Sequence, residues 1–202
     1  MRDLFVKSVT GAGADEKLLE TDVDKIPYSW SPDGRFILYQ TSERPGGNSE
    51  IWALPMAGEL KPILFLRSKF NDAQPRFSQD GKWVVYVSNE SGLQEVYATL
   101  FPGPGRMWQI SAGGGGAPLW RRDGKEILYE SLDGKLIAVP VSVRGDTLDV
   151  VAPKVLLDLQ SAGGWAYSTL DGQRFLISMS AEAERASPLV LVTNWPSALQ
   201  KK

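Results

Sequence analysis

The sequence predicts an all-β protein, a β-propeller of four-stranded antiparallel blades with about four to five blade units. The first observation is an Asp-Gly pair that returns in an equivalent context at Asp33, Asp80, Asp123 and Asp171. Successive aspartates are 47, 43 and 48 residues apart, and propeller blades repeat every 40 to 50 residues or so. The second observation is that short apolar segments recur at fixed places between these pairs. Spacing and segment length together predict one blade for each repeat.

The strand expected after each Asp-Gly pair is a nearly continuous apolar run, which suits a strand that is covered on both faces. Blades packed between two neighbouring blades supply that cover. These second strands are expected at 36–39, 83–86, 126–129 and 174–177.

The other strands of each unit are placed by the same repeat. An additional third strand is expected at 4–6, because Phe5 precedes Asp33 by 28 residues as Trp52 precedes Asp80. The innermost strands come before the turns, the first of them at 26–28. The remaining third strands are expected at 51–53, 96–98, 136–138 and 189–191, and the fourth strands at 17–21, 62–66, 106–110 and 154–159.

The Asp-Gly pairs are interpreted as turns rather than as ligands or catalysts. In Ser31-Pro32-Asp33-Gly34, proline presets the first corner, aspartate tolerates the second, and glycine takes the positive φ that ends the turn. A fifth pair, Asp133-Gly134, lies outside the repeat. It is expected to close a tight hairpin between the second and third strands of its own blade.

Aromatic residues at one repeat position are expected to pack between blades. Trp30, Phe77 and Trp120 each stand three residues before the turn aspartate, and large rings at such junctions supply most of the buried apolar area. Trp108 falls in a fourth strand, where exposure at the outer edge is expected. The run 113–116 is four glycines and is interpreted as a flexible connection between blades, since no Gly-Lys-Ser/Thr follows it.

The unit Ser-Pro-Asp-Gly, followed by an apolar strand ending in Tyr39 and then by Glu50-Ile51-Trp52, resembles the TolB-type, WD-like propeller repeat of bacteria. The resemblance spans nearly the whole chain. It implies a propeller of six or more blades.

The last stretch, 189–202, is similar to the ending of propellers that follow bacterial serine/threonine kinases and winged-helix regulators. This resemblance implies the C-terminal sensor or interaction part of such a protein. For the kinase type it also implies a place outside the cytoplasmic membrane, although the chain carries no targeting signal that would assign a compartment. No kinase chemistry is transferred, because a His-Arg-Asp loop is impossible in a chain without histidine.

Residues 1–202 are expected to be one propeller domain or a fragment of a larger ring. The expected strands begin with half a blade and end with an incomplete one, and exposed sheet edges invite pairing with another chain. Self-association through the incomplete blades, as a strand-exchanged dimer, is therefore one hypothesis. The approximate units are 1–24 (partial), 25–68, 72–111, 117–160 and 165–196 (partial).

Composition excludes several functions. The chain has 22 basic and 24 acidic residues, no cysteine and no histidine, so nucleic acid is not an expected partner and thiolate chemistry is excluded. A Ser-His-Asp triad is impossible, and Gly-x-Ser-x-Gly is also missing. No apolar segment is long enough to insert in a membrane. We expect a chain with no catalytic residues, no cofactor and no metal.

A ligand is expected at the mouth of the central channel, where loops enter the innermost strands, since rigid scaffolds display function on loops. Asp22 and Asp24 alone do not continue as a calcium loop does. The mixture of aromatic, amide and charged side chains suits a protein, a peptide or a small polar ligand. The candidate residues are Asp22, Asp24, Tyr28, Asp72, Gln74, Arg76, Trp165 and Tyr167.

The sequence thus predicts a non-catalytic recognition, sensor or protein-interaction module of a bacterial multidomain protein. Two alternatives remain open. The chain could be the propeller part of a prolyl-oligopeptidase-type hydrolase, whose catalytic domain would lie elsewhere, or a TolB-like periplasmic scaffold. The adjoining sequence would separate these hypotheses, since a kinase or DNA-binding domain favours the sensor and an α/β-hydrolase domain favours the enzyme.

Overall fold

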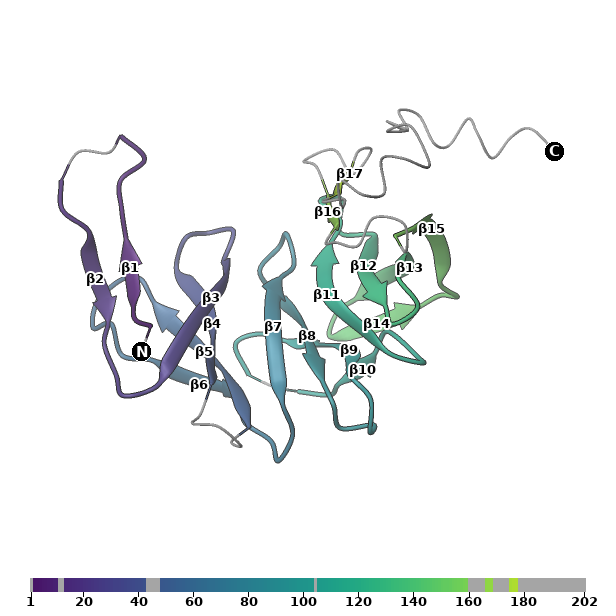
Figure 1. The fold of residues 1–202 in the computed structure, drawn as a ribbon, viewed down its shortest axis with the longest axis horizontal. Coiled ribbons are helices and arrows are strands. Elements are labelled where there is room, and N and C mark those ends of the chain that lie inside the picture. The colour runs from purple at the N-terminus through teal and green to yellow at the C-terminus, as the bar shows by residue number, and fades with distance from the viewer. Residues whose placement is uncertain are drawn as a thin grey trace, which may run out of the picture.

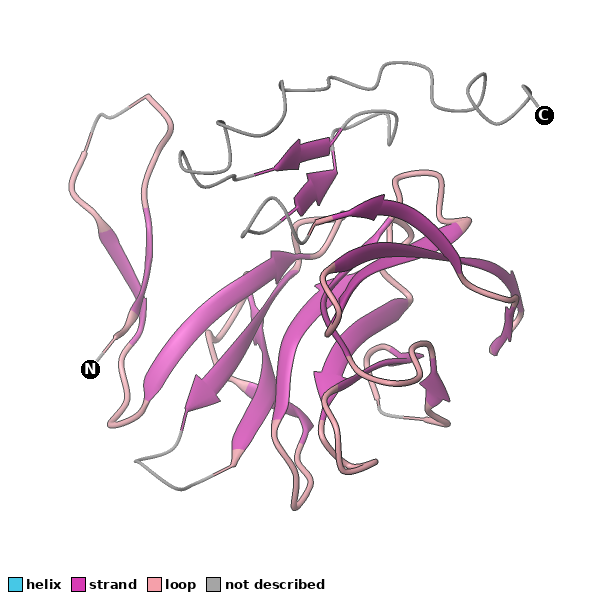
Figure 2. Ribbon diagram, turned by 45° about the vertical axis from the view of Figure 1, so that its right-hand side comes forward, coloured by secondary structure: helices cyan, strands magenta, loops and turns pink. Residues whose placement is uncertain are grey.

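A computed structural model of the chain describes residues 2–10, 13–42, 48–103, 105–159, 166–168 and 175–177. Within these ranges the chain forms strands joined by turns and loops (Figure 2). No helix in the described ranges is long and apolar enough to cross a membrane.

Three complete antiparallel sheets form the body of the molecule. The first contains β3 (Asp24–Trp30), β4 (Phe36–Ser42), β5 (Ser49–Pro55) and β6 (Ile63–Leu66). The second contains β7 (Asp72–Phe77), β8 (Trp83–Ser88), β9 (Glu95–Leu100) and β10 (Trp108–Gln109). The third contains β11 (Gly115–Trp120), β12 (Glu126–Ser131), β13 (Lys135–Arg144) and β15 (Lys154–Asp158), with β14 (Thr147–Val150) paired to the far end of β13.

A two-stranded half-sheet flanks this body at each end. The N-terminal half-sheet pairs β1 (Leu4–Val6) with β2 (Glu16–Leu19), and the C-terminal half-sheet pairs β16 (Ala166–Ser168) with β17 (Phe175–Ile177). The three complete sheets follow one another in an open arc, with β1 and β2 beyond the first sheet and β16 and β17 above β11 of the third sheet (Figure 1). This is the architecture of a partial β-propeller and confirms the predicted fold class.

The strands expected within the described residues are present, with one addition. The hairpin of β13 and β14 was not predicted. It forms because Val141 and Leu148 are buried in the cluster between the second and third sheets, while Arg144 and Asp149 form an ion pair of 3.1 Å. Gly145 turns the chain at a φ of 60°, a value that glycine adopts without strain. The third strand expected at 189–191 lies outside the described residues.

The core lies between the sheets. Phe77 of β7 packs with Leu38, Ile51 and Phe65 of the first sheet. The Phe101 ring completes this junction, with its centroid 4.9 Å from that of Phe77 in an edge-to-face arrangement that favours aromatic pairs. The next junction repeats the design with Trp120, Trp83, Val85, Val96 and Ile127.

The aromatic position before each turn is buried in two of three repeats. Phe77 is 6% exposed and Trp120 is 4% exposed, whereas Trp30 is 48% exposed. Trp30 stands at the same repeat position, but the sheet that precedes it in the chain, β1 and β2, has only two strands. Trp108 is half-buried and packs edge-on against Trp83, 5.0 Å between centroids, so the expectation of a simply exposed Trp108 is wrong.

Four Asp-Gly pairs, at Asp33, Asp80, Asp123 and Asp133, form the predicted turns, and Asp171-Gly172 lies outside the described residues. In the second sheet the Ser78 hydroxyl donates to Asp80 Oδ1 at 2.6 Å and accepts from the Trp83 amide at 3.0 Å. The Gly81 amide donates back to the Ser78 carbonyl at 3.0 Å, and the φ of Gly81 is 70°. Asp133-Gly134 closes the hairpin between β12 and β13, as predicted, through a bond from the Gly134 amide to the Ser131 carbonyl.

Candidate binding face

Three segments lead from one sheet into the innermost strand of the next. We call residues 20–29, 67–76 and 110–119 the entrance segments, and residues 31–36, 78–83 and 121–126 at the other end of the same strands the exit turns. The entrance segments hold the six candidate site residues that come before Trp165. Their geometry therefore decides what this face of the molecule can present.

A carboxylate at the start of the third strands β5 and β9 holds the entrance segment of the next sheet. Glu95, 3% exposed, accepts from the Gly114 amide at 2.8 Å and from the Ser111 hydroxyl. Glu50 in turn accepts from the Arg67 guanidinium, with one contact at 3.2 Å. A buried carboxylate needs such donors, because charge without partners is costly away from water.

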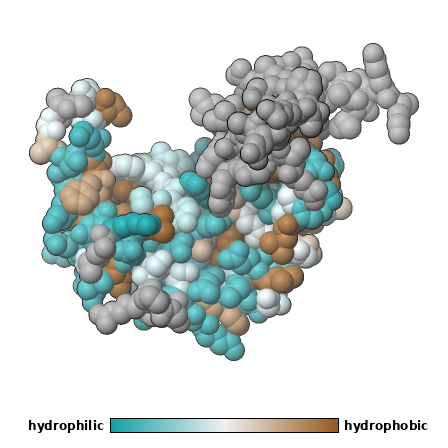
Figure 3. Space-filling view, in the orientation of Figure 1, coloured by the Kyte–Doolittle hydropathy of each residue, from teal (hydrophilic) through white to brown (hydrophobic). Residues whose placement is uncertain are grey.

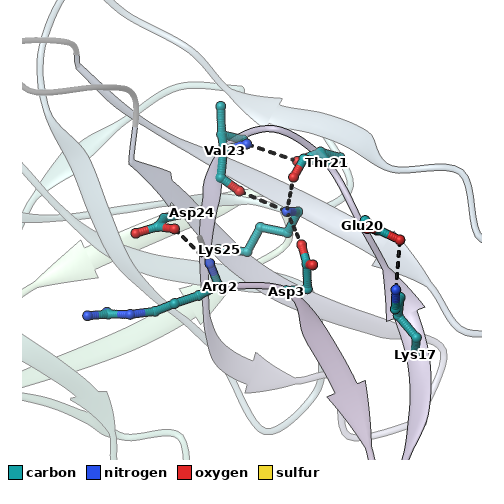
Figure 4. Close-up of polar contacts among 8 residues, drawn as sticks. All are labelled: Arg2, Asp3, Lys17, Glu20, Thr21, Val23, Asp24 and Lys25. Atoms are coloured by element: carbon teal, nitrogen blue, oxygen red, sulfur yellow. Dashed lines mark hydrogen bonds and ion pairs between the residues drawn. The ribbon is translucent and has the colours of Figure 1, made fainter.

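The same contact joins the N-terminal half-sheet to the first sheet (Figure 4). The buried Lys25 ammonium lies 2.9 Å from Asp3 Oδ1 and 2.8 Å from the Val23 carbonyl oxygen. The hydrogen bond from Lys25 lowers the pKa of Asp3. The sequence analysis missed these residues, although an acidic residue precedes the third strand at Asp3, Glu50 and Glu95.

The glycine run at 113–116, interpreted from the sequence as a flexible connection, packs closely against the third sheet. Gly114 has a φ of 99°, and a Cβ there would lie 2.2 Å from the Leu132 side chain. A Cβ on Gly115 would lie 2.8 Å from the Tyr129 ring and 2.9 Å from Ser111 Oγ. The glycines let the segment approach the third sheet closely while Gly114 donates to Glu95.

The innermost strand of each complete sheet carries a β-bulge at the same place. The register shifts between Pro27 and Ser29 in β3, between Ala73 and Arg76 in β7, and between Gly116 and Leu119 in β11. Bulges twist a strand and redirect side chains next to it. The shift lies opposite a buried second-strand tyrosine in every sheet: Tyr39, Tyr86 and Tyr129.

Side-chain amides connect the bulges of neighbouring sheets. Gln74 has a φ of 54° and Ala117 a φ of 49°, both in the left-handed region. The backbone N–H of Gln74 donates to Gln40 Oε1 at 3.3 Å, and the backbone N–H of Ala117 donates to Gln74 Oε1 at 2.8 Å. Gln74, a candidate site residue, thus links all three complete sheets.

Tyr28 and Arg76 are brought together from β3 and β7. The Arg76 guanidinium donates to the Tyr28 carbonyl, and its central carbon lies 5.6 Å from the centroid of the Tyr28 ring, a cation–π distance. Partial burial raises the pKa of the Tyr28 hydroxyl, and the positive charge of Arg76 opposes this shift. Both side chains are half-buried.

The candidate aspartates have different surroundings. Asp22 is exposed. Asp24 accepts from the Arg2 amide at 2.7 Å, which lowers the pKa of Asp24. Asp72 is 1% exposed and accepts from the Ser68 hydroxyl at 2.7 Å, and burial raises its pKa against that bond.

The other candidates lie further along the chain. Trp165 lies outside the described residues, and Tyr167 lies in β16. In the part of the chain that the structure describes, no three His, Cys, Asp or Glu side chains gather as a metal site requires. The face therefore offers hydrogen-bonding groups, aromatic surface and two cations stacked on rings, Arg76 on Tyr28 and Lys69 on Phe70.

Known structures share this fold. The putative TolB of Agrobacterium tumefaciens superposes with a TM-score of 0.56 and 16% identity, over 72% of this chain and 55% of that one. TolB of Acinetobacter baumannii superposes with a TM-score of 0.59 and 20% identity, over 83% of this chain and 40% of that one. The chain has a TolB-like propeller fold.

The chain spans about half the length of these two TolB structures. A puromycin-hydrolysing peptidase of Mycobacterium tuberculosis is also similar, with a TM-score of 0.57 and 16% identity over 88% of this chain and 35% of that one. No family model matches the sequence. No curated protein sequence matches it either. The likeness to kinase-fused or regulator-fused propellers stays a prediction.

Proposed function

We propose that this propeller is a non-catalytic recognition module that binds a protein or peptide through its entrance segments. The supporting observation is an internal comparison of the repeats. Positions that build the fold carry the same residue type in each complete sheet: the turn aspartate, the second-strand tyrosine, and the third-strand alanine of Ala53, Ala98 and Ala138. Packing and turn geometry account for these repeated residues.

Entrance positions differ where framework positions repeat. The innermost strands begin with Asp24, Asp72 and Gly115, and the residues after the bulges are Ser29, Arg76 and Leu119. The first residue of the innermost strand is therefore an aspartate in two sheets and a glycine in the third. The residue after the bulge carries a hydroxyl, a cation or an apolar group. The repeated fold does not require different side chains at these equivalent positions. Binding of one specific ligand does require them, because its surface is not repeated.

The side chains on this face suit a polypeptide ligand. Tyr and Arg are the residues most often found at the energetic centre of protein interfaces, and Tyr28 and Arg76 form a half-buried pair held in place by the framework. The described surface in the view of Figure 3 is mainly hydrophilic, with separate hydrophobic patches. Recognition by polar contacts around an aromatic–cation pair is consistent with such a surface.

The parent protein is proposed to be a bacterial multidomain protein with this propeller at its C-terminus, of the serine/threonine kinase or winged-helix type. The absence of histidine from the whole sequence supports a chain without general acid–base chemistry of the triad kind. A second candidate is the propeller of a hydrolase, which the likeness to the mycobacterial peptidase favours. A TolB-like periplasmic scaffold is the third.

Selection of short random peptides displayed on phage tests the binding proposal without knowledge of the natural ligand. Selected peptides should bind Arg76→Ala about tenfold more weakly or worse, because a central Arg carries more than about 1 kcal/mol at such interfaces. Lys82→Ala, at an exposed position in an exit turn, is the matched control and should bind normally. Peptides that bind both variants equally, or failure to enrich any, would refute the proposed function.

A further inference from the structure

Two glutamine side chains on the binding face use their acceptors for the framework and keep their donors. Gln40 Oε1 accepts from the backbone N–H of Gln74 at 3.3 Å, and Gln74 Oε1 accepts from the backbone N–H of Ala117 at 2.8 Å. A side-chain amide has one oxygen that accepts and one nitrogen that donates. Because both oxygens are bound to backbone, each side chain retains its Nε2 group for another partner.

The two Nε2 groups are accessible to a ligand. In the part of the chain that the structure describes, neither of them donates a hydrogen bond. The buried side-chain polar atoms that lack a partner in the same ranges are Trp83 Nε1, Ser88 Oγ and Trp120 Nε1. The glutamine nitrogens are not among these atoms, and both glutamine side chains are half-buried, so water reaches the two donors.

Arg76 and Tyr28 add donors at the same junction of the first and second sheets. Arg76 of β7 crosses to Tyr28 of β3. Gln74 of β7 crosses in the same way to Gln40 of β4. A guanidinium carries five N–H donors and no acceptor, and a phenol carries one O–H donor. We call Tyr28, Gln40, Gln74 and Arg76 the donor cluster.

The candidate aspartates near the start of the innermost strands are held by other donors. Asp24 accepts from the backbone N–H of Arg2 at 2.7 Å. The buried Asp72 accepts from the Ser68 hydroxyl at 2.7 Å. Neither carboxylate supplies an acceptor to the two Nε2 groups, so a ligand is free to supply one.

A negatively charged group with several acceptors fits the donor cluster. Both oxygens of a carboxylate accept hydrogen bonds, and hydrogen bonds that involve an ionised group are about twice as strong as neutral ones. We propose that the donor cluster binds the side-chain carboxylate of an acidic residue in the bound peptide. This inference rests on the proposed function and specifies its ligand as an acidic peptide.

The charge of the donor cluster favours a carboxylate over a phosphorylated side chain. The cluster contains one formal positive charge, on Arg76, which is stacked on the Tyr28 ring. A carboxylate carries one negative charge, whereas a phosphorylated side chain carries about 1.5 to 2 at neutral pH. Phosphorylated motifs are generally bound by clusters of arginines. One arginine accompanied by two neutral amides therefore matches a carboxylate.

Two phage libraries of random peptides test the acidic ligand and peptide binding separately. The libraries are identical except for a fixed central residue, which is glutamate in one and glutamine in the other. Enrichment is expected from the glutamate library. A selected sequence is then synthesised with each central residue and with an amidated C-terminus, so that the side-chain carboxylate is what differs. The glutamate peptide should bind about tenfold more tightly or better, because it alone brings a charge to Arg76.

Gln74→Glu tests the donor cluster in the protein. Its carboxylate can still accept from the Ala117 N–H, but the Nε2 donor is replaced by an oxygen that repels an acidic ligand. The glutamate peptide should bind this variant about tenfold more weakly or worse, and the glutamine peptide should lose much less. Gln79→Glu, exposed in an exit turn, adds the same charge elsewhere and should leave both affinities unchanged. Gln40→Glu gives the same readout if circular dichroism shows that Gln74→Glu does not fold.

The possible outcomes distinguish the acidic ligand from peptide binding itself. Equal affinities of the glutamate and glutamine peptides would overturn the acidic ligand and leave peptide binding in place. Equal losses of both peptides in a folded Gln74→Glu chain would also overturn it, because the effect would then not depend on charge. Enrichment from neither library would contradict peptide binding, and the acidic ligand with it.

Discussion

The two ends of the innermost strands differ in how far they repeat. At the exit turns, the same aspartate and glycine stand in every complete sheet, and Ser31 and Ser78 make the same hydrogen bonds. At the entrance segments the backbone repeats down to the bulge, but the side chains differ. The exit turns show what the fold requires, and the entrance segments show what the fold leaves open.

The third sheet shows how the exit turn tolerates a change. Arg121 stands where Ser31 and Ser78 stand, yet the Gly124 amide still donates to the residue 121 carbonyl at 2.9 Å. Arg121 pairs instead with Glu126 at 2.7 Å. The backbone turn is thus retained when the side-chain contact is replaced. The backbone hydrogen bond is common to all three turns, whereas the serine hydrogen bonds are not.

The largest effect is expected at the aromatic position before the exit turn. Phe77→Ala should lower the free energy of unfolding by about 3–5 kcal/mol, because it leaves a cavity between two sheets. Trp30→Ala at the equivalent exposed position should cost roughly 1 kcal/mol or less. Urea denaturation measures both. Similar losses for the two variants would show that burial between sheets is not what distinguishes them.

A somewhat smaller loss is expected where an entrance segment serves the framework. Gly115→Ala should destabilise the protein by about 1–3 kcal/mol, since its Cβ meets the Tyr129 ring and Ser111. Gly103→Ala is the control, because no atom lies within 4 Å of a Cβ at that position. Equal stability of the two variants in thermal unfolding would contradict the close approach inferred for the glycine run.

The exit turn itself should contribute less. Ser78→Ala removes the hydroxyl that bonds to Asp80 and to the Trp83 amide, and should cost about 1–2 kcal/mol. Ser142→Ala, on the exposed face of β13, should change stability by roughly 0.5 kcal/mol or less. A loss at Ser142 as large as that at Ser78 would argue against the turn as a specific stabilising element.

The smallest expected effects are changes of the unfolding free energy with pH. They have opposite signs for Asp33 in an exit turn and Asp72 in an entrance segment. Hydrogen bonds from Ser31 and Arg35 lower the pKa of Asp33 to about 2. Ionised Asp33 therefore stabilises the fold above its ordinary pKa of 3.8, and this contribution is lost as pH falls toward 2. Burial raises the pKa of Asp72, so its contribution is present below 3.8 and is lost as pH rises through the raised pKa.

Asp33→Asn and Asp72→Asn separate these contributions. Relative to the unmodified chain, Asp33→Asn should be least stable near neutral pH and should recover toward pH 2. Asp72→Asn should become relatively more stable as pH rises from 3.8 upward. Unfolding free energies measured in urea across this pH range check both, and parallel profiles would contradict the opposite signs.

Much of the framework could be predicted because it depends on local rules. The Asp-Gly turns follow from the φ values that glycine tolerates, and the burial of Phe77 and Trp120 follows from repeat position. The exposure of Trp30 did not follow, because burial depends on the neighbouring sheet and not on the residue. The β13–β14 hairpin was missed because it belongs to one repeat alone.

The candidate site was predicted less completely than the fold. Tyr28 and Arg76 were both selected for their place near the innermost strands, but their contact depends on a bulge that shifts each strand by one residue. Sequence spacing does not show such a shift. Gln40 was missed because it lies in a second strand, and only the junction of two sheets brings it to the Gln74 amide.

The affinity of one selected peptide, measured for an entrance variant and an exit variant, tests the central claim most directly. Tyr28→Ala removes the ring beside Arg76, and Ser78→Ala weakens an exit turn. The account predicts that Tyr28→Ala binds about tenfold more weakly, while Ser78→Ala binds normally despite its lower stability. Equal affinities, or a loss confined to Ser78→Ala, would contradict the assignment of recognition to the entrance segments.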